Sequence, residues 1–131
     1  MDKLGWSDRL STGFAAIDED HKTLFEYLRT LEAAVGDHGG REMARGILGG
    51  LRDYAKYHFE REEAIFTQHH GYKLIDFHLE QHRQFARQME TFEEQLSSDA
   101  DISGEMVAYL SKWLVRHIMT EDKVFFDSYA S

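Results

Sequence analysis

The sequence contains no cysteine and no proline. Without cysteine there can be no disulfide, no thiolate-ligated metal or iron–sulfur cluster and no thiol nucleophile, so any metal must be held by nitrogen and oxygen ligands. The absence of proline favours long, uninterrupted helices, because one proline inside a helix costs about 3 kcal/mol.

Long apolar runs and an excess of positive charge are also missing. No stretch of about 18 apolar residues could span a bilayer, and the first residues lack the basic and apolar segments of a secretion signal. We therefore expect a soluble, cytoplasmic protein with no membrane insertion. The 24 acidic and 15 basic residues give a formal charge of −9, which opposes nucleic-acid binding through the general surface.

The 131 residues, of which 42% are hydrophobic, are enough for one domain with its own core. Gly- and Asp-rich breaks at 35–40, 69–73 and 97–104 separate segments in which apolar residues recur at steps of three and four. Short loops make neighbouring helices antiparallel, so the sequence predicts an all-α, up-down-up-down four-helix bundle. We expect a single domain over residues 1–131, with an N-terminal arm over about 1–17 and the bundle over about 18–128.

Two further features of these segments concern the packing of the helices. The periodicity predicts Leu74 and Val124 on core-facing positions. Gly46, Gly49 and Gly50 weaken the beginning of the second segment by about 1 kcal/mol each relative to alanine. Either that helix begins late, or two backbones pack closely there.

Several polar residues occupy positions where a bundle should present leucine. They are His21, His58, Glu62, His78, His82 and His117. In an antiparallel bundle all six fall within a slab on the order of 10 Å thick at one end. Burying them costs several kcal/mol for each unsatisfied group, and a metal centre satisfies them together. One ion seldom takes so many protein ligands, which indicates two ions bridged by Glu62.

The fourth segment offers two candidates for a second bridging carboxylate. Glu121 lies four residues after His117 and faces the site in an ideal helix. Asp122 lies five residues after His117 and is rotated by about 140°, unless the last turn is widened or frayed. Spacing alone therefore favours Glu121.

The whole series of motifs resembles the hemerythrins, and in particular their bacterial members. The motifs are IDEDH ending at His21, HFERE from His58, HLEQH from His78 and HIMTED from His117. The leader GWSDRLSTGFAAIDEDH also resembles the tryptophan-containing arm of the family, although Ala16 stands where proline is expected nearby. The resemblance covers nearly the whole chain and implies two iron ions (Fe(II)/Fe(III)) with an oxo or hydroxo bridge.

The resemblance also implies a ligand for each position. One iron would be held by His78, His82 and His117 and the other by His21 and His58. Glu62 and Asp122 would bridge them, which overrules the spacing preference for Glu121. An apolar oxygen pocket would be formed by Leu24, Phe59, Trp113, Leu114 and Ile118.

The remaining polar residues near the motifs are expected at the surface. His38, His69 and His70 lie in or beside loops and are interpreted as surface or capping residues. Glu60, Arg61 and Glu63 are interpreted as a solvated face.

The function implied is reversible, non-enzymatic dioxygen binding for transport, storage or delivery to an oxygen-consuming partner enzyme. The alternatives are a di-iron oxidase or peroxidase and an oxygen or redox sensor. About nine residues follow Asp122, so we expect sensing to need a separate partner. We expect a monomer.

Overall fold

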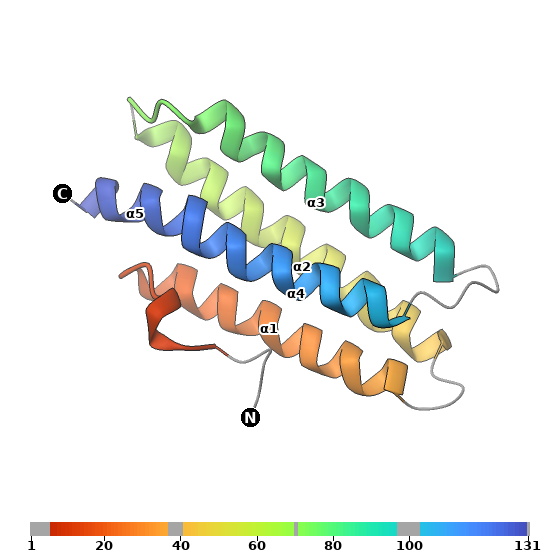
Figure 1. The fold of residues 1–131 in the computed structure, drawn as a ribbon. Coiled ribbons are helices and arrows are strands. Elements are labelled where there is room, and N and C mark those ends of the chain that lie inside the picture. The colour runs from red at the N-terminus through yellow and green to blue at the C-terminus, as the bar shows by residue number, and fades with distance from the viewer. Residues whose placement is uncertain (1–5, 37–40, 70, 97–102, 131) are drawn as a thin grey trace.

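The computed structural model describes residues 6–36, 41–69, 71–96 and 103–130. Its elements are η1 (Asp8–Leu10), α1 (Ala15–Gly36), α2 (Arg41–Gln68), α3 (Ile75–Leu96), α4 (Ser103–His117), η2 (Ile118–Asp122) and α5 (Lys123–Ala130). The elements form four long helical rods, and α4, η2 and α5 together make one of them. Figure 1 shows these rods lying side by side. The described ranges contain no strand. The predicted all-α four-helix bundle is confirmed.

The residues before α1 fold back against its first turns (Figure 1). Asp18 anchors them, because its carboxylate accepts hydrogen bonds from the Thr12 backbone N–H and hydroxyl, both at 2.8 Å, and from the Ser11 hydroxyl at 2.7 Å. Leu10 is buried in the core. The helix itself begins at Ala15, inside the range expected for the arm.

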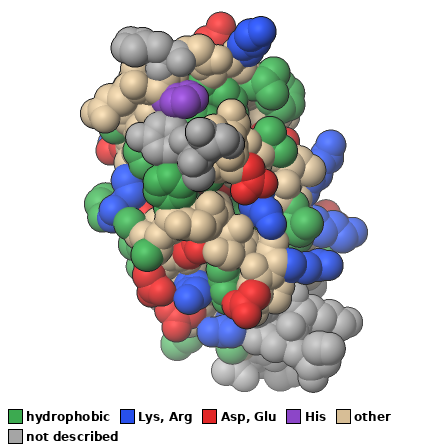
Figure 2. All heavy atoms as spheres, turned by 90° about the vertical axis from the view of Figure 1, so that its left-hand side faces the viewer, with side chains coloured by type: hydrophobic (Ala, Val, Ile, Leu, Met, Phe, Trp, Pro, Cys, Tyr) green, Lys and Arg blue, Asp and Glu red, His purple; other side chains and the backbone are tan. Residues whose placement is uncertain are grey.

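The core consists of two apolar clusters separated along the bundle axis. The smaller cluster contains Ile17, Phe66, Phe125 and Phe126, at the end where α1 begins and α2 ends. The larger cluster fills the remaining length of the bundle and includes Leu24, Phe59, Phe85 and Leu114. In every helix the polar residues singled out from the sequence lie between these two clusters. Figure 2 shows the surface of the molecule at the end where α1 begins and α2 ends; acidic and basic side chains are interspersed on it.

Two predicted core positions are wrong. Leu74 is 54% exposed and precedes Ile75, the first residue of α3, so it does not share the buried face of that helix. Val124 is 51% exposed, because the π-helical η2 adds a residue to one turn and rotates everything after it. Phe125 and Phe126 are buried instead.

Close packing explains one of the three glycines of α2. The helix is formed from Arg41 onward, so it does not begin late. A Cβ at Gly50 would lie 3.0 Å from Cε1 of Tyr27 on α1, whereas a Cβ at Gly46 would meet nothing within 4 Å. Gly50 therefore permits the approach of α1 and α2. No helix within the described part of the chain is both long and apolar enough to cross a membrane.

Candidate metal centre

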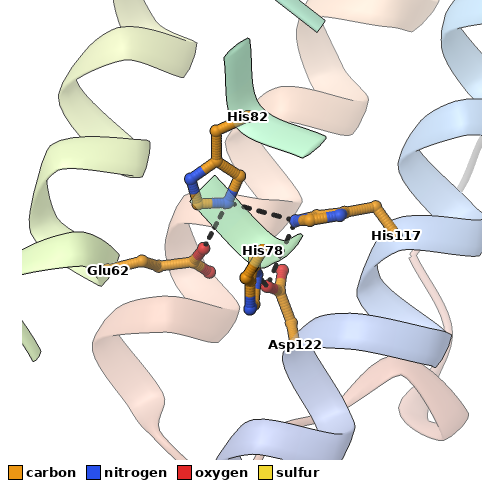
Figure 3. A group of neighbouring side chains, drawn as sticks. All are labelled: Glu62, His78, His82, His117 and Asp122. Atoms are coloured by element: carbon orange, nitrogen blue, oxygen red, sulfur yellow. Dashed lines mark hydrogen bonds and ion pairs between the residues drawn. The ribbon is translucent and has the colours of Figure 1, made fainter. Parts of the chain in front are cut away.

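Seven side chains from all four rods meet between the two apolar clusters. Figure 3 shows five of them: Glu62 from α2, His78 and His82 from α3, His117 at the end of α4, and Asp122 from η2. His21 of α1 and His58 of α2 complete the set. None of the seven is more than 3% exposed.

The seven residues form two overlapping groups. One group contains Glu62, His78, His82, His117 and Asp122, and the other contains His21, His58, Glu62 and Asp122. Within each group the candidate ligand atoms all lie within 4.8 Å of one another. Each group is therefore compact enough for its side chains to reach one ion.

The two carboxylates belong to both groups, and each divides its oxygens between them. Glu62 places Oε2 3.0 Å from His58 Nε2 and Oε1 3.3 Å from His82 Nε2. Asp122 places Oδ2 3.1 Å from His21 Nε2 and Oδ1 2.8 Å from His78 Nε2. This is the arrangement that two neighbouring ions joined by two carboxylates would require.

Protein partners alone do not satisfy this cluster. Six of its buried atoms make no hydrogen bond with the described residues: both ring nitrogens of His21, Nε2 of His58, both carboxylate oxygens of Glu62 and Oδ2 of Asp122. Leaving so many polar atoms buried without partners is costly. One candidate ligand atom of each residue lies within 4.8 Å of the others in its group, and imidazole nitrogens with carboxylate oxygens suit iron, zinc or copper. The residues present therefore fit a metal pair.

Asp122 enters the cluster because η2 is π-helical. The wider turn from Ile118 to Asp122 rotates the fifth residue after His117 inward, and Asp122 is fully buried. Glu121 instead lies on the outer side of His117, where its Oε1 accepts a hydrogen bond from the ring nitrogen Nδ1 at 2.9 Å. The expectation from ideal spacing, that Glu121 faces the site, is wrong.

Most of the histidines contact a second polar group through ring nitrogen Nδ1. On Nδ1, His58 contacts Asp20 at 2.9 Å, and His82 contacts Glu63 at 2.8 Å. His78 contacts the hydroxyl of Tyr72 at 2.7 Å through the same ring atom. Such contacts fix the ring orientation and leave Nε2 free to bind a metal.

These outer partners are the functional residues that sequence reasoning missed. Arg61 and Glu63 are not simply a solvated face, because Arg61 Nε lies 2.9 Å from Asp20 and Glu63 holds His82. Glu60 is exposed as expected. The available signal was chemical: a metal-bound histidine needs a partner on its other nitrogen. Spacing alone does not say which nearby carboxylate supplies it.

The electrostatics of the metal-free cluster are those of paired opposite charges. Burial lowers the pKa of His58, but the Glu62 carboxylate and the hydrogen bond with Asp20 overcome this and raise the pKa to about 10. The pKa of His117 is also raised to about 10, since Asp122 and Glu121 outweigh its burial. Conversely, burial raises the pKa values of Glu62 and Asp122, and the charge of Asp122 raises that of Glu62 further, but the surrounding histidines bring both pKa values well below the usual range.

The expected oxygen-pocket residues lie beside the cluster, toward the larger apolar core. Leu24, Phe59, Leu114 and Ile118 are buried and Trp113 is partly buried against them. The ring of Phe59 stacks on His82 with centroids 3.9 Å apart, and Trp113 stacks on His117 at 4.5 Å.

Of the other three histidines, one lies apart from the two groups and two lie outside the described residues. His69 is partly exposed, and its ring contacts the edge of Phe125 with centroids 5.5 Å apart. His38 and His70 lie outside the described residues.

The bundle and its buried cluster define a class: a four-helix protein with a candidate two-cation site of histidines and shared carboxylates. A family profile described as the hemerythrin HHE cation binding domain matches residues 12–129. The chain belongs to the hemerythrin family.

Individual relatives agree with this assignment. A bacteriohemerythrin of Pseudomonas aeruginosa is 31% identical over 130 residues, covering 98% of this chain and 82% of the relative. The hemerythrin of Phascolopsis gouldii is 29% identical over 121 residues, covering 92% and 89%. In fold, the chain is similar to a crystal structure of a hemerythrin mutant, with a TM-score of 0.87 at 22% identity and 97% coverage of both chains.

Proposed function

We propose that this chain binds dioxygen reversibly, without acting as an enzyme, at a pair of iron ions held by the seven buried residues. The family is known for di-iron oxygen binding. The observation that carries the proposal for this chain is that its two ligand groups share Glu62 and Asp122, with one oxygen of each carboxylate directed to each group.

The proposed ligand roles differ between the two irons. His78, His82 and His117 would hold one iron, His21 and His58 would hold the other, and Glu62 and Asp122 would be shared by both, together with an oxo or hydroxo group. When bound, the iron pair supplies the electrons and the open coordination position that dioxygen requires. The ion held by His21 and His58 would have one protein ligand fewer than the other, so dioxygen would bind there.

The surrounding apolar residues are proposed to keep water and protons away from this position. Leu24, Phe59, Leu114 and Ile118 are between 0% and 6% exposed. Neither these four side chains nor that of Trp113 can act as an acid, a base or a nucleophile on a bound substrate. Exclusion of water protects a reactive bound species from side reactions, which favours reversible binding over turnover.

Repeated oxygen cycling tests the proposal. The metal-free chain is loaded with ferrous iron under anaerobic conditions, oxygen is admitted and then removed, and the visible spectrum is followed through several cycles. We expect a band that appears with oxygen and disappears without it, with little loss per cycle. Irreversible conversion to a ferric form, or turnover with a reductant and substrate, would instead support a redox sensor or a di-iron oxidase. Light scattering on the same sample tests the expected monomeric state.

A further inference from the structure

A cleft of about 320 Å³ lies on the surface between α2 and α3. Ala55, Phe59, Phe85, Ala86 and Met89 line its apolar part, and His82 also lines it. Ala55 on α2 and Ala86 on α3 leave the space open because neither side chain extends beyond Cβ. The cleft therefore runs from solvent to a residue of the candidate metal centre.

The side chain of Phe59 borders both this cleft and the candidate metal centre. Phe59 is 6% exposed, lines the cleft, and also belongs to the proposed oxygen pocket. Its ring lies flat on His82 at a centroid distance of 3.9 Å and 5.8 Å from the ring of His58. Because the ring borders both, its rotation would open the cleft toward the proposed pocket.

The charges at the rim of the cleft indicate a neutral occupant. Three basic and three acidic side chains line it: Arg52, Lys56, Arg83, Glu60, Glu63 and Glu90. Their formal charges cancel, so the rim does not concentrate ions of either sign. Inside the rim the walls are mostly apolar, which suits a small apolar molecule.

We propose that the α2–α3 cleft is the route by which dioxygen enters and leaves, and that the Phe59 ring is its gate. This inference rests on the proposed oxygen-binding function and adds the path to the site. A gas route differs from a binding determinant in one measurable way: narrowing it slows entry and exit equally and leaves the equilibrium affinity unchanged.

A second groove is an alternative route by which dioxygen could reach the site. It lies between α3 and α4, and it also reaches a site histidine, His117. Its lining is more polar and includes Gln81, Gln84, Arg116 and Glu121. Polar, hydrated walls are less favourable for an apolar gas, so we assign entry to the α2–α3 cleft.

Two tryptophan substitutions on the same helix separate these routes. Ala86→Trp fills the α2–α3 cleft, and Gln84→Trp fills the α3–α4 groove; both positions are exposed, so the fold tolerates either. Oxygen association and dissociation rates of the iron-loaded chains are measured by stopped-flow mixing. We expect Ala86→Trp to slow both rates by a common factor of at least about three, with unchanged affinity, and Gln84→Trp to change neither. Unchanged rates in Ala86→Trp, or slowing by Gln84→Trp instead, would overturn the route.

Xenon tests the cleft without iron. In the metal-free chain under xenon pressure, we expect the methyl resonances of Ala55 and Met89 to shift, and Ala86→Trp to abolish the shift. No xenon-dependent shift would overturn the proposal. Failure of the unmodified, iron-loaded chain to bind oxygen reversibly would refute the proposed function, whereas normal binding with unaltered rates in Ala86→Trp would refute the route alone.

Discussion

Asp122 and Glu121 are adjacent acidic residues with opposite surroundings. Asp122 is fully buried, and its two oxygens face histidines of both ligand groups. Glu121 is partly exposed and accepts hydrogen bonds from the outer nitrogen of His117 and from the hydroxyl of Thr120. At the scale of single residues, Asp122 is proposed to bind metal and Glu121 to orient a ligand.

Substitution of each residue should separate these roles. We expect Asp122→Ala to lose at least one of two irons, because it removes a ligand shared by both groups. Glu121→Ala should retain both irons at saturating metal, with affinity weaker by about 10- to 100-fold, as is typical when an outer partner is removed. Iron per chain is measured by metal analysis after gel filtration. Loss of iron from Glu121→Ala together with retention in Asp122→Ala would reverse the assignment.

The raised histidine pKa values predict a proton release. His58 and His117, with pKa values of about 10 in the metal-free chain, are protonated at neutral pH. A metal binds the neutral imidazole, so loading at pH 7.5 should release protons from both. Calorimetry in two buffers of different ionisation enthalpy measures the number released. Identical heats in the two buffers would contradict the prediction.

The same pKa shifts determine how the stability of the metal-free chain changes with pH. A folded-state pKa raised from 6.5 to about 10 stabilises the fold fully below pH 6.5. That contribution is lost progressively as the pH rises from 6.5 to about 10. Melting temperatures of the metal-free chain should therefore fall across this window. The metal-loaded chain should not share this fall, because its imidazoles are already neutral.

At the scale of the elements, the glycines of α2 divide into two kinds. Gly46 has open space around its missing Cβ, whereas a Cβ at Gly50 would press against Tyr27. Gly46→Ala should raise the free energy of unfolding by roughly 0.5–1 kcal/mol, since alanine is the better helix former. In Gly50→Ala the crowded ring offsets this gain.

Denaturant unfolding of the two variants checks this prediction. The expected order of stability is Gly46→Ala above the unmodified chain, with Gly50→Ala below Gly46→Ala. Equal stabilisation by both substitutions would show that the approach of α1 and α2 does not depend on Gly50.

The π-helical turn marks the limit of what periodicity could predict. Steps of three and four correctly predicted the helices and the inward faces of His58, Glu62, His78 and His82. The same rule failed at Glu121 and Val124, because a single inserted residue in η2 changes the register of everything after it. Only the resemblance pointed to Asp122, since local helix propensity does not predict the widened turn.

At the scale of the whole molecule, the bundle contains a polar layer between two apolar clusters. The sequence predicted this layer because residues from four segments fell at one depth. The outer partners Asp20 and Tyr72 could not be predicted, because many carboxylates and hydroxyls lie near the histidines in sequence and only the packing selects among them.

This architecture predicts that metal stabilises the entire fold. Metal binding should raise the melting temperature, because it satisfies buried atoms that make no hydrogen bond in the described structure and binds the folded chain preferentially. Scanning calorimetry before and after chelation measures the effect. Zinc, which accepts the same nitrogen and oxygen ligands, should restore part of the stability but no oxygen-dependent spectrum. A melting temperature indifferent to chelation would count against a metal in this layer.

The most direct test of the central claim is a crystal structure of the iron-loaded chain with anomalous diffraction at the iron edge. We predict two anomalous peaks, one beside His21 and His58 and one beside His78, His82 and His117, with Glu62 and Asp122 contacting both. A single peak, or two peaks that Asp122 does not join, would contradict the proposed di-iron centre.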